Sequence, residues 1–229
     1  MWRGRIVLGS FALVAVLLLM FPSVDLAVAG YFFDGKSFLR DQWWQVFLHE
    51  ALGYYLGACL IGISALYVIN RIFKRRICNV CGRRVLYAFL VLIVGAGLIV
   101  NVALKDNFGR ARPRDVAEFG GTKQFTPAFV VSHECKTNCS FSSGDAAGGF
   151  FSIAMALALT RRRVFLAAAV ALGALIALAR ISSGAHFFSD TVVSFFVMLI
   201  TADVLYVYLL VPRAEREKST RGSSALEPA

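Results

Sequence analysis

The sequence predicts an all-α, polytopic membrane protein in which six transmembrane helices form one bundle. Of the 229 residues, 58% are hydrophobic and only 17% are charged, whereas a soluble domain keeps about a quarter of its residues charged. The charges gather in short clusters between long apolar runs. The net charge of +10 does not indicate nucleic acid as a partner, because basic residues at the ends of apolar segments are better explained by membrane orientation.

Six apolar segments are predicted to cross the membrane, at residues 6–26, 48–69, 85–104, 144–159, 164–181 and 190–211. A crossing needs roughly 20 residues, and each should be helical because unpaired backbone groups are too costly in lipid. The first resembles a signal peptide, but its long apolar stretch and weak cleavage site favour a retained helix. Together the segments predict a membrane domain over 1–212, followed by a polar, disordered cytoplasmic tail over 213–229.

Basic residues predict how these segments are oriented. They gather before the first segment, in the second and fourth connections, and after the last segment, at residues 3–5, 71–84, 161–163 and 213–221. These regions alternate along the chain so that all of them lie on the cytoplasmic side, as positive residues do in membrane proteins. Both termini are therefore expected inside. The connections 27–47, 105–143 and 182–189 are expected to face outward.

Cysteine placement agrees with this topology. Cys135 and Cys139 lie in the long outward connection, where an oxidising compartment would permit a disulfide, although such close spacing requires a turn and leaves their pairing open. Cys78 and Cys81 form a Cys-x-x-Cys pair in a basic inner connection. One pair supplies only two of the four ligands of a structural zinc site. Two ordinary thiols are therefore the favoured interpretation, and a metal site between subunits is the alternative.

Three polar stretches contain most of the residues that need a functional explanation. They are residues 105–113 after the third segment, 140–145 before the fourth, and 180–190 between the fifth and sixth. The predicted topology brings all three to one membrane depth on the outward face. Lys105, Arg112 and Arg180 within them are cations that suit a phosphate group and the charge that spreads over it in a transition state.

The same stretches contain groups suited to anion binding and nucleophilic attack. Ser143 and Gly144 come at the start of a predicted helix, where free backbone N–H groups and the positive helix end can bind an anion. His186 and Asp190 are four residues apart, which places them on one helical face. A carboxylate there can hold one ring nitrogen protonated and leave the other free to attack.

These stretches resemble the signature of the phosphatidic acid phosphatase type 2 superfamily, which also includes vanadium-dependent haloperoxidases. The signature is Lys-x6-Arg-Pro, then Pro-Ser-Gly-His, then Ser-Arg-x5-His-x3-Asp. Residues 105–113 match the first motif completely. Arg180, His186 and Asp190 match the third at full spacing, with Ala179 in place of its serine. The six-helix pattern extends the resemblance over nearly the whole chain.

The resemblance implies a lipid phosphatase that needs no metal or other cofactor. Phosphate would be bound by Lys105, Arg112, Arg180, Ser143 and the Gly144 amide. His186 would attack phosphorus and form a phosphohistidine that water then hydrolyses, and Asp190 would orient His186. Each basic residue taken alone suits a position at the membrane interface, so it is the joint spacing that favours a site.

The second motif departs from the family pattern at two positions. Ser142 replaces proline, and Asp145 replaces the histidine that in the family protonates the leaving oxygen. Asp145 could act as an acid only with a raised pKa. It could instead activate water or pair with a cation, and His133 in the same connection is an alternative acid. His49 and Glu50, which open the second segment, are interpreted as an interfacial pair.

A Ser-Gly-Asp form of this motif also occurs among bacterial phosphatases that resemble the lipid A 4′-phosphatases. The preferred substrate is therefore lipid A, at its 4′- or 1-phosphate, on the periplasmic side of a bacterial inner membrane. Undecaprenyl pyrophosphate, phosphatidylglycerol phosphate and phosphatidate are alternative substrates. A protein of another class, which binds or transports a phospholipid without turnover, is the alternative if Asp145 marks the loss of catalysis.

Overall fold

The structure is a computed structural model that describes residues 2–212. Within this range it contains helices, short 3-10 turns and loops, and no strand apart from an isolated β-bridge between Val116 and Lys123. The prediction of an all-α fold is thereby confirmed. The predicted tail, residues 213–229, lies outside the described residues.

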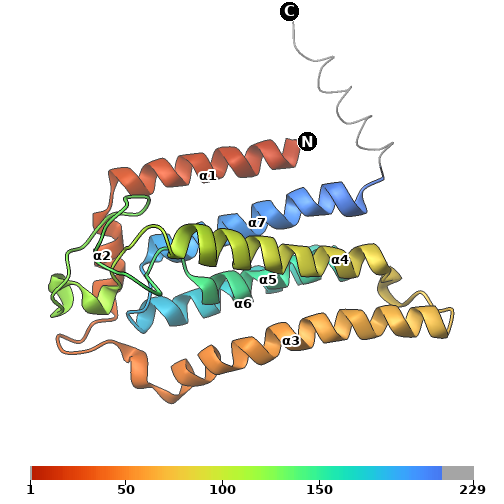
Figure 1. The fold of residues 1–229 in the computed structure, drawn as a ribbon, viewed down its shortest axis with the longest axis horizontal. Coiled ribbons are helices and arrows are strands. Elements are labelled where there is room, and N and C mark those ends of the chain that lie inside the picture. Colours follow the sequence, from red (N-terminus) through yellow and green to blue (C-terminus); the bar gives the residue numbers. More distant parts are fainter. Residues whose placement is uncertain (1, 213–229) are drawn as a thin grey trace, which may run out of the picture.

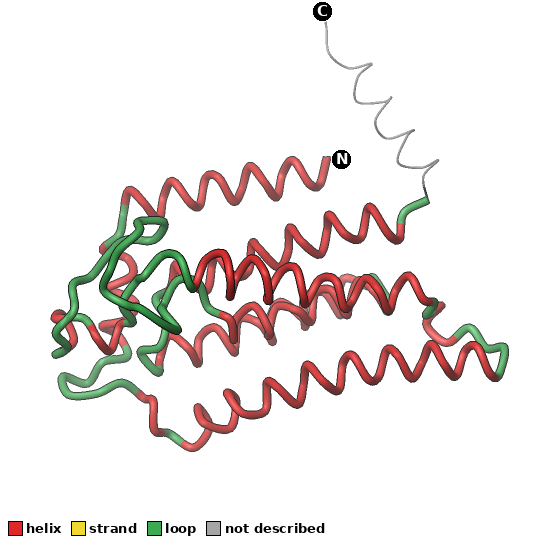
Figure 2. Tube along the Cα trace, in the orientation of Figure 1, coloured by secondary structure: helices red, strands yellow, loops and turns green. Residues whose placement is uncertain are grey.

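Long helices run along the molecule, whereas most loop residues gather at one end (Figure 1). These helices are α1 (Trp2–Met20), α3 (Trp43–Ile72), α4 (Gly82–Leu90) with its π-helical continuation η3 (Val91–Lys105), α5 (Gly144–Leu159), α6 (Arg163–Ser182) and α7 (Phe188–Leu210). Figure 2 shows the long loops at the end of the bundle opposite the start of α1 and the end of α7. The connections predicted to share one face therefore do share one end of the bundle.

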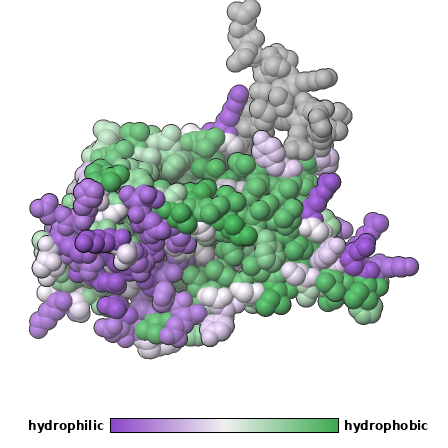
Figure 3. Space-filling model, viewed as in Figure 1, coloured by the Kyte–Doolittle hydropathy of each residue, from purple (hydrophilic) through white to green (hydrophobic). Residues whose placement is uncertain are grey.

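Four described helices are long and apolar enough to cross a membrane, or five if α1 is counted with α2 (Ser23–Tyr31). The four are α3, the continuous α4–η3 helix, α6 and α7. The apolar helix α5 has only 16 residues, fewer than the roughly 20 that a perpendicular crossing needs. The surface agrees with this assignment, because hydrophilic residues lie at both ends of the visible face and an apolar belt separates them (Figure 3).

The first predicted segment, 6–26, is not one continuous helix. The chain breaks near Pro22, and the two helices on either side are bent by 83°. Proline lacks a backbone N–H and restricts the residue before it, so it commonly ends a helix. The bend directs α2 across the loop end of the bundle (Figure 1).

Helix α5 packs at the centre of the bundle, against α6 and α7. Most of its residues are buried, and glycines allow α6 to come close. A Cβ on Gly149 would lie 3.2 Å from the Gly173 Cα, and a Cβ on Gly173 would lie 2.1 Å from Phe150 Cδ1. Small residues permit such close approach between helices in membranes, which explains the alanine- and glycine-rich composition of these two segments.

We predict that Gly173→Ala destabilises the protein by about 1–3 kcal/mol, because the added methyl group overlaps the Phe150 ring. Equilibrium unfolding in detergent micelles measures the change. Gly53→Ala is the matched control, since a Cβ there meets nothing within 4 Å. Its expected effect is a gain of about 0.5–1 kcal/mol from helix propensity. Equal stability of the two variants would contradict the proposed close packing of α5 and α6.

Candidate active site

A polar pocket of about 310 Å³ opens at the loop end of the bundle. Four of its lining residues are arginines, namely Arg40, Arg112, Arg114 and Arg180, and His49 also lines it. Several cations around one small cavity suit an anionic ligand that can accept several charge-assisted hydrogen bonds. Arg112 and Arg180 were predicted from the motifs, whereas Arg40 and Arg114 are additional cations.

Asp145, at the start of α5, lies between the side chains of His49 and Arg180. Its Oδ2 atom is 2.8 Å from Nδ1 of His49 and 2.9 Å from Nε of Arg180. The Arg180 contact is an ion pair without hydrogen-bond geometry, so the buried Nε has no hydrogen-bond acceptor among the described residues. An arginine donor left in this state is available to an oxygen of a bound anion.

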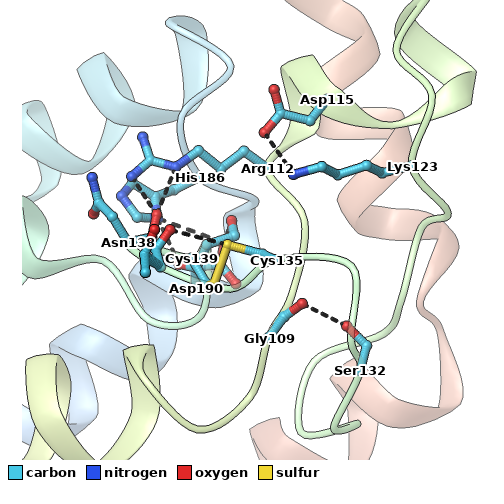
Figure 4. The surroundings of a disulfide bond; sticks show 12 residues. Gly109, Arg112, Asp115, Lys123, Ser132, Cys135, Asn138, Cys139, His186 and Asp190 are labelled. Carbon is cyan, nitrogen blue, oxygen red and sulfur yellow. Dashed lines mark hydrogen bonds and ion pairs between the residues drawn. A yellow bond between two sulfur atoms is a disulfide. The ribbon is translucent and has the colours of Figure 1, made fainter.

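Lys105 and Arg112 lie close to the same group. Lys105 is near enough to Arg112, Arg180 and Asp145 for their charges to interact. Arg112 donates hydrogen bonds from Nε and Nη2 to the Asn138 carbonyl oxygen, at 3.2 and 2.7 Å (Figure 4). Burial lowers the pKa of Arg112 to about 10, assisted by the nearby cations. Arg112 therefore stays positively charged at neutral pH.

His186 is buried in the turn between α6 and α7. Its Nδ1 atom lies 2.7 Å from the Ser140 carbonyl oxygen. Because a carbonyl oxygen only accepts hydrogen bonds, this contact assigns the proton to Nδ1 and leaves Nε2 as the basic nitrogen. Asp190, the predicted partner, is 3.8 Å from Nδ1. The Ser140 carbonyl is therefore the acceptor that directly fixes the His186 ring, and Asp190 influences the ring only indirectly.

Asp190 is held in a fully buried network around Arg110. Arg110 Nη1 lies 2.5 Å from Asp190 Oδ1, and Arg110 Nη2 lies 2.8 Å from Asp25 Oδ2. The second Asp190 oxygen accepts from the Ser140 hydroxyl at 2.5 Å and from the Phe187 amide at 2.8 Å. The network joins α2, the loop after η3 and the start of α7. The network thereby fixes Ser140 and Asp190, the two residues beside the His186 ring.

The beginning of α5 has the conformation that the second motif predicts. The Ser143 hydroxyl caps the helix by accepting from the Ala146 amide at 3.3 Å. A Cβ on Gly144 would lie 2.7 Å from Asn101 Oδ1, so a larger residue would displace that side chain. The Ser142 hydroxyl is buried without a hydrogen-bond partner among the described residues.

Cys135 and Cys139 form a disulfide with a Cα–Cα distance of 5.6 Å, which settles the pairing that the sequence left open. The bridge closes the turn that contains Asn138, whose carbonyl oxygen binds Arg112 (Figure 4). Cys78 and Cys81 are exposed free thiols. Within residues 2–212, no group of three or more His, Cys, Asp or Glu side chains is placed to hold a metal ion.

Sequence reasoning missed two parts of the site. His49 was interpreted as interfacial, yet it contacts Asp145 across 96 positions of sequence. Arg110 lies within the first motif stretch but received no role in phosphate binding or catalysis from the sequence, yet it pairs with Asp25 and Asp190. One available signal was Asp25, because an acidic residue inside an apolar segment usually has a charged partner. His133 is exposed and makes no hydrogen bond or ion pair with the site in the described structure.

Comparison with known families shows that the PAP2 superfamily model matches residues 86–213, more than half of the chain. The chain belongs to the PAP2 superfamily. PAP2 is the phosphatidic acid phosphatase type 2 superfamily, so the resemblance drawn from the motifs is confirmed. The PAP2 protein is a phosphoric monoester hydrolase of the lipid phosphatase type.

Several relatives of this PAP2 protein are named lipid A 4′-phosphatase. One from Francisella tularensis subsp. novicida (strain U112) is 34% identical over 91% of this chain and 97% of its own length. One from Rhizobium leguminosarum is 37% identical over 48% of both chains, and one from Rhizobium etli is 35% identical over 48% of this chain and 43% of its own. No solved structure matches the sequence significantly.

We predict that Arg110→Met destabilises the PAP2 protein by about 3–5 kcal/mol, because it leaves two buried carboxylates without their cation. Denaturant titration in micelles gives the free energy of unfolding. Arg114→Met is the control, since its 3.9 Å contact with Asp115 is partly exposed and should be worth no more than about 1 kcal/mol. An Arg110 variant as stable as the Arg114 variant would contradict the assignment of Arg110 as the cation of this buried network.

The buried position of His186 predicts an unusual acid limb in the pH profile. Burial, followed by the charges of Lys105 and Arg112, lowers the pKa of His186 below its ordinary value of 6.5, against the opposing effect of Asp190. The free base needed for attack therefore persists to lower pH than for an ordinary histidine, and the midpoint of the acid limb of kcat/KM should lie below pH 6.5. The substrate phosphate also ionises in this pH range. Its ionisation is measured by phosphorus NMR, and its effect is removed from the pH profile of kcat/KM. A limb attributable to the enzyme above pH 6.5 contradicts the prediction.

Proposed function

We propose that the protein removes the 4′-phosphate of lipid A on the periplasmic face of a bacterial inner membrane, through a phosphohistidine on His186. The observation that carries the proposal is the basic nitrogen of buried His186, which lies close enough to Lys105 and Arg112 for their charges to act on it. Arg112 is one of the four arginines that line the polar pocket. The named function of the relative that is similar over 91% of this chain supports lipid A as the substrate.

The proposed orientation places the loop end of the bundle in the periplasm. The disulfide of Cys135 and Cys139 lies at that end, and disulfides persist in the periplasm. Basic residues 71–84 and 161–163 lie at the other end, where the positive-inside rule places the cytoplasm. In this arrangement the α1–α2 pair and α5 complete six crossings, both termini are cytoplasmic, and residues 1–212 form one membrane domain.

Phosphate binding is proposed to use the cations at the pocket together with the start of α5. Lys105, Arg112 and Arg180 would balance the phosphate charge. The Nε of Arg180 is ion-paired with Asp145 but has no hydrogen-bond acceptor among the described residues, so its N–H could donate to a phosphate oxygen. Ser143 and Gly144 would add the positive end of the helix dipole. The cations supply the charge that Mg²⁺ supplies in many other phosphoryl-transfer enzymes, so no cofactor is included in the proposal.

Catalysis is proposed to begin with attack of His186 Nε2 on phosphorus. The Ser140 carbonyl holds the Nδ1 proton and stabilises the positive charge that develops on the ring. Asp190 supports this arrangement through its hydrogen bond with the Ser140 hydroxyl. The bond from phosphorus to the sugar oxygen breaks, and water then displaces His186 from the phosphohistidine to release inorganic phosphate.

A second pocket supports a lipid substrate. It has a volume of about 730 Å³ and is lined almost wholly by apolar residues of α2, α6 and α7. Ile181 on its wall directly follows Arg180 of the polar pocket. A molecule with a phosphorylated headgroup and acyl chains could therefore place one part in each pocket.

We predict that the purified protein releases phosphate from lipid A phosphorylated at the 4′ position and leaves the 1-phosphate in place. Undecaprenyl pyrophosphate, phosphatidylglycerol phosphate and phosphatidate, tested in the same detergent, are expected to react at least about tenfold more slowly, or about 1.4 kcal/mol of transition-state discrimination. His186→Ala is the inactive control. Preference for another lipid would reassign the substrate. Binding of lipid without release from any substrate would favour the non-catalytic alternative.

A further inference from the structure

His49 lies on α3, outside the three family motifs, yet its side chain lines the polar pocket together with Arg112 and Arg180. Its Nδ1 atom is 2.8 Å from Oδ2 of Asp145. Asp145 occupies the position where the family pattern has the histidine that protonates the leaving oxygen. A histidine is therefore present at this place in the pocket, although another helix supplies it.

We propose that His49 is the catalytic acid that protonates the leaving oxygen and that Asp145 is the residue that positions it. The pair divides between α3 and α5 the work of the single histidine in the family motif. This inference rests on the proposed function, and it adds to that function the identity of the group that the sequence left unassigned.

The contacts of Asp145 decide against this residue as the acid itself. Its carboxylate faces both His49 and Arg180, and nearby positive charges favour the ionised form of a carboxyl group. An ionised carboxylate can only accept hydrogen bonds. It therefore suits the role of holding the Nδ1 proton of His49, which directs Nε2 of that ring toward other partners.

The position of His49 is fixed by the helix that carries it. Gln45 lies one turn earlier on the same face of α3, and its Nε2 donates a hydrogen bond to the Ser182 hydroxyl at 2.6 Å. This buried bond anchors α3 to the end of α6, two residues after Arg180. The His49 side chain is 57% exposed, so a substrate in the pocket can reach it.

The proton and electron balance of the two steps is complete with these groups. In the first step, the electron pair of His186 Nε2 forms the bond to phosphorus, and the pair of the broken P–O bond stays on the sugar oxygen. That oxygen takes the Nε2 proton of His49. In the second step, water attacks phosphorus while neutral His49 accepts its proton, and the P–N bond returns its pair to His186.

The decisive experiment compares His49→Ala on two leaving groups. Single-turnover release of the lipid alcohol should fall by about 100- to 10,000-fold, which is the usual contribution of acid catalysis. The burst of nitrophenol from 4-nitrophenyl phosphate should change by less than about threefold, because a good leaving group needs no proton. His133→Ala and Glu50→Ala are matched controls and should keep the wild-type rates on both substrates.

A second variant distinguishes the loss of a catalytic group from the loss of folded structure. In the double variant His49→Ala, Asp145→His, the family arrangement is restored, and lipid turnover should recover at least about tenfold over His49→Ala. The proposal is overturned if His49→Ala keeps wild-type lipid turnover, or if both substrates slow equally and the double variant shows no recovery. An inactive wild-type protein, by contrast, would contradict the proposed phosphatase function itself.

Discussion

The ion pairs of Arg110 with Asp25 and Asp190 are the interaction on which the rest of the site depends. They are wholly buried, and a buried charge is tolerated only when it is paired and hydrogen-bonded. Asp190 in turn accepts from Ser140, whose carbonyl fixes the His186 ring. A change at Arg110 is therefore expected to reach the nucleophile through two intervening residues, Asp190 and Ser140, although Arg110 does not line the pocket.

Much of the architecture could be predicted because the membrane restricts what each segment can do. Apolar segments must be helical in lipid, so the later helices begin and end near the residues expected, and α5 spans the predicted 144–159. The motif residues Arg112 and Arg180 line one pocket because the loop after η3 and the end of α6 lie at the same end of the bundle. Spacing and topology sufficed for that part of the site.

The remaining features depend on how the helices are rotated and bent. A segment that is apolar on all sides does not indicate which face meets its neighbours, so nothing in sequence pointed His49 of α3 toward Asp145 of α5. The same limit concealed the pairing of Asp25 with Arg110. Pro22 gave a local signal for the bend after α1, but a proline in the sequence does not by itself specify the 83° angle between the two helices.

The central claim is that His186 attacks the phosphate of a lipid held in the arginine-lined pocket. Rapid quenching after mixing the protein with lipid A labelled at the 4′-phosphate, followed by peptide mapping, tests it most directly. The account predicts a transient label on His186, absent from His186→Ala, that decays as inorganic phosphate appears. Phosphate released with no label on the protein, or with the label on another residue, would contradict it.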